Sequence, residues 1–84
     1  MSNQDLVVVH QAEQHRFVVN TQDVEAVLEY HLAGQDIDFH RTFVPPQLRG
    51  QGIAEKLVRT GLAWAKSENV NINASCSYVV KFLR

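Results

Sequence analysis

The sequence predicts an α+β fold in which a mostly antiparallel sheet is covered by one long helix. Three observations carry this prediction. Four segments rich in β-branched and alternating apolar residues come first, with polar turn residues between them. A segment with helical spacing of apolar residues follows. A short strand-like segment and a final helical turn come last, so the predicted element order is β-β-β-β-α-β-α.

The four N-terminal strands are predicted from composition and alternation. Residues 6–10 and 16–20 are short valine-containing runs, separated by the polar residues 11–15. Residues 24–30 alternate apolar and polar positions, which is typical of a strand with one covered face. Residues 37–44 alternate in the same way, which places Phe39 and Phe43 on one face and His40 and Thr42 on the other.

The helix is predicted over residues 50–67, where apolar side chains recur on one face. The Pro45-Pro46 step ends the strand before it, because proline lacks the N–H that a ladder needs. Residues 71–74 follow as a fifth strand, which we expect to lie parallel to the fourth because the chain crosses over through the helix. Ser75 is expected to cap a final short helix that contains Tyr78.

Composition indicates one small domain over residues 1–84. The apolar fraction is 45% and the net charge is −1, which argues against nucleic acid or an anionic membrane as the main partner. The sequence has no apolar run near the roughly 20 residues that a membrane-spanning helix needs. A single cysteine suits a reducing compartment, so we expect a cytoplasmic protein. A chain this short buries little surface, and a second subunit would stabilise it.

The segment 44–54 carries the strongest functional signal. Gly50 and Gly52 are predicted in the first helical turn, where backbone N–H groups have no intrahelical partner and the dipole is positive. Such a turn attracts a phosphate or diphosphate group. The segment is not a Walker A loop, since no Gly-Lys-Ser/Thr follows, and it is not a dinucleotide fingerprint, since Glu55 stands where the third glycine would be. A strand–helix turn that binds no anion is the structural alternative.

Gln47-Leu48-Arg49-Gly50-Gln51-Gly52 resembles the Gln/Arg-x-x-Gly-x-Gly/Ala segment that holds the diphosphate of acetyl-CoA in the GNAT superfamily of N-acetyltransferases. Residues 40–45 and 76–82 resemble a subgroup of very small GNAT proteins, which pair a His-Thr-x-Val-Pro strand with a C-terminal Cys-x-Tyr/Phe-Val element. Here Arg41 stands between His40 and Thr42. Full-sized members carry helices between their first two strands, and these are missing. The resemblance therefore implies an acceptor site that is open or completed by a second subunit, as in a homodimer.

The resemblance implies acetyl-CoA as co-substrate. Main-chain groups of Phe43 and Val44 would pair with the pantetheine arm, where the fourth and fifth strands splay apart. The diphosphate would contact the loop and first helical turn, namely Gln47, Leu48, Arg49, Gly50, Gln51, Gly52, Ile53 and Ala54. Lys56 and Arg59 either meet the 3′-phosphate or are solvated helix charges.

Acetyl transfer to an amine needs a neutral amine, a polarised carbonyl and a proton for the departing thiolate. Three residues are candidates for these tasks. Cys76 is either an acetyl-enzyme nucleophile, a contact of the cofactor, or a packed structural residue. Tyr78 resembles the position from which GNAT enzymes protonate coenzyme A, or else it closes the core. His40 either accepts the amine proton or is a half-buried, hydrogen-bonded histidine.

The remaining candidates have weaker signals. Glu25 and Glu29 are either general bases in an open acceptor site or solvated charges of the sheet. Trp64 is expected in the core or at a dimer contact. No metal is expected, because the other histidines lack the spacing of a metal pair and no cysteine or carboxylate cluster completes a site (His10, His15, His31).

The sequence as a whole predicts an N-acetyltransferase that acts on an amine of a protein or on a polyamine by direct attack in a ternary complex. The alternative is a non-catalytic module that binds coenzyme A or a protein partner. The lack of an unambiguous general base supports that alternative.

Overall fold

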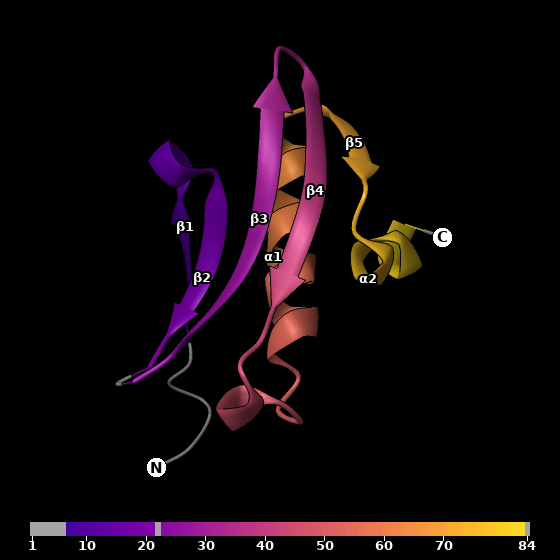
Figure 1. The fold of residues 1–84 in the computed structure, drawn as a ribbon. Coiled ribbons are helices and arrows are strands. Elements are labelled where there is room, and N and C mark those ends of the chain that lie inside the picture. Colours follow the sequence, from indigo (N-terminus) through magenta and orange to yellow (C-terminus); the bar gives the residue numbers. More distant parts are fainter. Residues whose placement is uncertain (1–6, 22, 84) are drawn as a thin grey trace.

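The computed structural model describes residues 7–21 and 23–83, which form a single five-stranded sheet with a long helix packed on one face (Figure 1). The strands are β1 (Val8–Gln11), β2 (Arg16–Asn20), β3 (Glu25–Ala33), β4 (Asp36–Phe43) and β5 (Asn71–Ala74). The helices are α1 (Ile53–Ser67) and α2 (Ser77–Val80), with 3-10 turns η2 (Ala12–Gln14), η3 (Pro46–Leu48) and η4 (Lys81–Leu83). The predicted α+β class and element order are confirmed.

The strand order is β1-β2-β3-β4-β5. The first four strands form an antiparallel meander, and β5 pairs with β4 in parallel, as the crossover through α1 predicts. Pairing between β4 and β5 ends at Phe39 and Ala74, although β4 continues to Phe43. The two strands therefore separate over the last part of β4. In the described part of the chain, no helix has the length and apolar character needed to cross a membrane.

The core lies between the sheet and α1. Phe17, Leu28 and Phe39 of the sheet are almost completely buried, and Leu57 and Val58 of α1 are buried against them. Gly61 lies where the helix packs tightly on the sheet, because a Cβ placed there would come within 2.9 Å of Leu28 Cδ2. The absence of a side chain at this position lets α1 pack directly on the central strands.

A β-bulge breaks the alternation predicted for the fourth strand. The β3–β4 register shifts between Glu29 and Tyr30, which face Arg41 and Phe39, so that His40 is the extra residue. The prediction that Phe39 and Phe43 share one face is therefore wrong, since Phe39 is fully buried and Phe43 is 40% exposed. One inserted residue moves every later side chain of the strand to the other face.

Two predicted helix starts also differ from the structure. The long helix begins at Ile53, so Gly50 and Gly52 precede the first turn instead of lying in it, with Gly52 as the N-cap. Both glycines have left-handed backbones, with φ of 81° and 74°, which a residue with a side chain rarely adopts. The prediction that Ser75 caps the last helix is wrong, because Cys76 is the N-cap and Ser75 Oγ donates to Asp38 Oδ2 at 2.6 Å.

Candidate functional site

A pocket of about 230 Å³ lies where the end of β4, the loop before α1 and α2 meet. It is lined by Val44, Leu48, Arg49, Gly50, Gly52, Ile53, Ala54, Glu55 and Tyr78. Most of the cofactor residues predicted from the sequence therefore line one pocket, together with the predicted catalytic Tyr78. Glu55 is the lining residue that sequence reasoning did not assign, although its place in the first turn of α1 could have indicated it.

Three of the predicted cofactor residues lie outside this lining. Phe43 lies on the exposed side of the sheet, where the Arg41 guanidinium sits 5.4 Å from its ring centroid. Gln47 lines a second pocket, of about 330 Å³, near the β2–β3 turn. Gln51 donates through its side-chain amide to the Gln47 carbonyl at 3.4 Å. A contact of these residues with the cofactor stays a prediction.

Local hydrogen bonds hold the loop before α1 in a compact form. The Leu48 amide donates to the Pro45 carbonyl at 2.9 Å, and Arg49 Nε donates to the Val44 carbonyl at 3.0 Å. The helical ladder starts with the Lys56 amide, which donates to the Gly52 carbonyl at 3.0 Å. The amides between Gly52 and Lys56 therefore have no acceptor within the helix. They lie at the positive end of the helix dipole.

The space in front of these amides is open. A Cβ built on Gly50 or Gly52 would meet no atom within 4 Å apart from those of the adjacent residues, so the space beside both glycines is open to an anion. Arg49 contributes a positive charge to the lining. The negative charge of Glu55 is countered by Arg59, whose Nε donates to Glu55 Oε2 at 2.7 Å. This set of donors fits a diphosphate group.

Tyr78 borders the same pocket from α2. Burial raises the pKa of its hydroxyl above the ordinary value, and the nearby charge of Glu55 adds to this effect. The phenol is therefore protonated at neutral pH. It can donate a proton to a base that develops in the pocket during a reaction.

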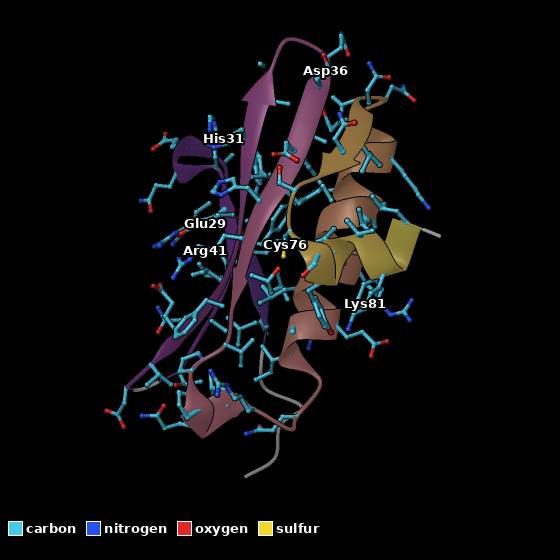
Figure 2. All side chains as sticks on the ribbon, turned by 45° about the vertical axis from the view of Figure 1, so that its right-hand side comes forward. Glu29, His31, Asp36, Arg41, Cys76 and Lys81 are labelled. Atoms are coloured by element: carbon cyan, nitrogen blue, oxygen red, sulfur yellow. The ribbon has the colours of Figure 1, made fainter. Side chains whose placement is uncertain are left out.

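Cys76 lies beside the gap between β4 and β5 (Figure 2), where its amide donates to the Phe39 carbonyl at 3.1 Å. Its Sγ is 3.5 Å from Thr42 Oγ1. Burial by itself would raise the pKa of the thiol. Hydrogen bonds from the Thr42 hydroxyl and from the amides of Val79, Tyr78 and Thr42 outweigh burial, and the pKa lies below its ordinary value.

The predicted acid–base candidates of the sheet lie on its other face. Glu29, His31 and Arg41 point away from α1 (Figure 2), and Arg41 Nη1 is 3.2 Å from Glu29 Oε2. Glu25 is likewise paired, 3.5 Å from Arg16 Nη2. His40 stacks on His31, with ring centroids 4.1 Å apart and planes 15° from parallel. Of the three predicted catalytic residues, the structure places Tyr78 in the pocket lining, Cys76 outside that lining beside Thr42, and His40 on the open face.

The other polar aromatic residues form a cluster near the C-terminal end of α1, away from the pocket. His10 Nε2 is 2.6 Å from the Tyr30 hydroxyl oxygen, and its ring stacks on Phe17 with centroids 4.1 Å apart. Trp64 meets the His10 ring edge-on at 4.6 Å, which favours the core interpretation of Trp64. Among the described residues, no group of three or more His, Cys, Asp or Glu side chains could hold a metal ion.

The half-buried environment of His10 predicts a pH-dependent stability. Burial lowers its pKa from the ordinary 6.5, Glu68 partly opposes this, and His15 adds to it. The unfolded chain therefore binds a proton first as the pH falls. We expect the melting temperature to be highest above pH 6.5 and to fall as the pH drops from there through the lower pKa of the folded state.

Melting curves of the wild type and of His10→Phe test this expectation between about pH 8 and pH 5, a range that spans the ordinary pKa of histidine. The phenylalanine keeps a ring in the cluster and removes the titrating group, so its melting temperature should depend less on pH. His15→Asn is the control, because asparagine tolerates the left-handed backbone of residue 15, and it should keep most of the pH dependence. Equal slopes for wild type and His10→Phe would contradict the assignment.

Comparison with known proteins gives concordant matches. Residues 16–84 match the family model described as GCN5-related N-acetyl-transferase. Protein NATD1 of Bos taurus is 32% identical over 80 residues, covering 92% of this chain and 71% of that protein. Protein NATD1 of Homo sapiens is 31% identical with the same coverage. The solution structure of a GCN5-like putative N-acetyltransferase from Staphylococcus aureus superposes with a TM-score of 0.72 and 28% identity, over 99% of this chain and 80% of that chain.

Proposed function

Because the chain belongs to the GCN5-related N-acetyltransferase family, we propose that it transfers acetyl from acetyl-CoA to an amine of a protein or to a polyamine. The observation that carries the proposal is the pocket before α1, which combines amides that precede the helical ladder with a protonated phenol. One domain over residues 1–84 would carry the reaction in the cytoplasm. The Cys76-x-Tyr78-Val79 string supports placing the chain in the small subgroup with that C-terminal element.

The arrangement of the pocket supports one orientation of acetyl-CoA. The diphosphate would accept hydrogen bonds from the amides between Gly50 and Ala54, with Arg49 beside it. The pantetheine arm would run along the gap where β4 and β5 separate, past Val44. The acetyl group would then lie near Thr42 and Cys76, which flank that gap.

We propose direct attack as the main reaction. The amine lone pair forms a bond to the acetyl carbon, the carbon–sulfur bond breaks, and its electron pair leaves on the sulfur of coenzyme A. The Tyr78 hydroxyl gives that sulfur a proton, and the proton lost by the amine passes to His40, directly or through water. The open face around His40 favours an extended amine over a small molecule that must be enclosed.

A second route is favoured by the hydrogen bonds that converge on Cys76. In this route the Cys76 thiolate bonds to the acetyl carbon, the bond from that carbon to the sulfur of coenzyme A breaks, and Tyr78 gives the departing sulfur a proton. The amine then attacks the same carbon, the electron pair of the carbon–sulfur bond returns to Cys76 Sγ, and the amine loses its proton to His40 or water. Replacing Cys76 by alanine separates the two routes. Direct attack predicts that the kcat of Cys76→Ala stays within about tenfold of the wild-type value, because the side chain then serves only to position the thioester.

The measurement is release of free thiol with a panel of amines, combined with intact-protein mass spectrometry after incubation with acetyl-CoA alone. Loss of turnover in Cys76→Ala, together with an acetylated wild-type protein that the variant does not form, would establish the covalent route instead. Thermal stabilisation by acetyl-CoA without turnover on any amine would support the alternative function, a non-catalytic coenzyme A-binding module. No saturable heat in calorimetry at millimolar acetyl-CoA would overturn both.

A further inference from the structure

The β-bulge determines where the His40 side chain can act. His40 follows Phe39, the last β4 residue paired with β5, and it is the extra residue opposite Glu29 and Tyr30. The Phe39 carbonyl accepts hydrogen bonds from the amides of Ser75 and Cys76. His40 is therefore next in sequence to the point where the two strands separate, and the acetyl group would be presented there.

The orientation of the His40 ring depends on one neighbour. In the described part of the chain, the stack on His31 is the only directed contact that the His40 side chain makes. The other polar groups nearby are already paired: Asp38 accepts a hydrogen bond from Ser75, and Arg41 pairs with Glu29. His31 itself projects from the exposed side of β3 (Figure 2) and lies in no buried cluster.

From this geometry we propose that His31 is a positioning residue, which holds the His40 imidazole at the mouth of the β4–β5 gap by ring stacking. The inference rests on the proposed function, in which His40 receives the proton of the amine. A partly exposed imidazole on a strand otherwise samples several rotamers. Stacking against a second ring limits these rotamers and keeps the His40 ring beside His31 on the open face of the sheet.

The test compares two replacements of His31. His31→Ala removes the stack and should lower kcat about tenfold, because a displaced base slows proton transfer. The KM for acetyl-CoA should stay unchanged, since the cofactor pocket lies on the other face. His31→Phe keeps a flat ring at the same place and should restore kcat to within about twofold of the wild type. Leu32→Ala removes an exposed side chain from the same strand and should have no effect.

Coupling to His40 distinguishes positioning from a general loss of stability. In a His40→Ala background the replacement of His31 by alanine should cause no further loss of kcat, because the ring that it positions is absent. Equal kcat for the wild type and His31→Ala would overturn the proposal. Failure of His31→Phe to restore activity, or additive losses in the double variant, would overturn it as well.

Proton NMR of the His40 ring gives a readout that does not depend on turnover. The His31→Ala variant should lose the ring-current displacement of the His40 signals, and the His31→Phe variant should keep such a displacement. If the wild type transfers acetyl but the His40 signals are unchanged in His31→Ala, the positioning role of His31 is overturned and the proposed function stands. A wild type that transfers acetyl to no amine overturns the proposed function and the catalytic purpose of the stack, even where the ring signals show stacking.

Discussion

Replacing Gly52 by glutamate is expected to lower the affinity for acetyl-CoA by about a hundredfold or more, which corresponds to about 3 kcal/mol. Gly52 lines the pocket before α1, and an added Cβ would meet no atom within 4 Å apart from those of the adjacent residues. The carboxylate would occupy the region proposed for the diphosphate and repel it, and facing like charges cost several kcal/mol. Calorimetric titration with acetyl-CoA measures the effect.

Gly34→Glu is the matched control for this variant. Gly34 also has a left-handed backbone, with φ of 61°, and also has no atom within 4 Å of an added Cβ, but it lies in the turn between β3 and β4. Both variants therefore carry similar backbone strain and the same added charge, and only one faces the pocket. We expect Gly34→Glu to bind acetyl-CoA normally. Normal binding by Gly52→Glu would show that the diphosphate lies elsewhere.

Replacing Tyr78 by phenylalanine is expected to lower kcat about a hundredfold, which is a typical loss for removing a general acid. Tyr78 lines the pocket, and burial raises the pKa of its hydroxyl, so the group holds its proton at neutral pH. Without this proton donor, the sulfur of coenzyme A must leave as a thiolate or take a proton from water. The KM for acetyl-CoA should change little, because the phenyl ring remains.

Tyr30→Phe controls for the loss of a tyrosine hydroxyl from the core region. Tyr30 is buried and its hydroxyl pairs with His10 in the aromatic cluster near the other end of α1, so its removal leaves the pocket intact. This variant should be less stable and should keep its kcat at temperatures where it is folded. A Tyr78→Phe variant with wild-type kcat would assign Tyr78 to packing, with its ring 5.3 Å from that of Phe82.

The sequence by itself determined the element order, the parallel placement of β5 and most of the pocket before α1. The strand end and the loop before α1 depend on residues that are close in the chain, and the placement of β5 follows from the crossover through the helix. The Pro45-Pro46 step ends the pairing of β4, two glycines supply the left-handed backbone, and apolar spacing defines the following helix. Gly50, Gly52 and Ile53 therefore could be assigned to one pocket from local chemistry alone.

Only the tertiary structure decided which face each residue of β4 occupies. The alternation of apolar and polar residues in one strand cannot reveal a β-bulge, because the inserted residue is defined by the strand opposite. His40 is the inserted residue only because Glu29 pairs with Arg41 and Tyr30 pairs with Phe39. The environment of Cys76 is likewise built from β4 and α2 together. The stack of His31 on His40 joins two strands across the bulge. These contacts depend on strand register, which is a property of paired segments and of no single one.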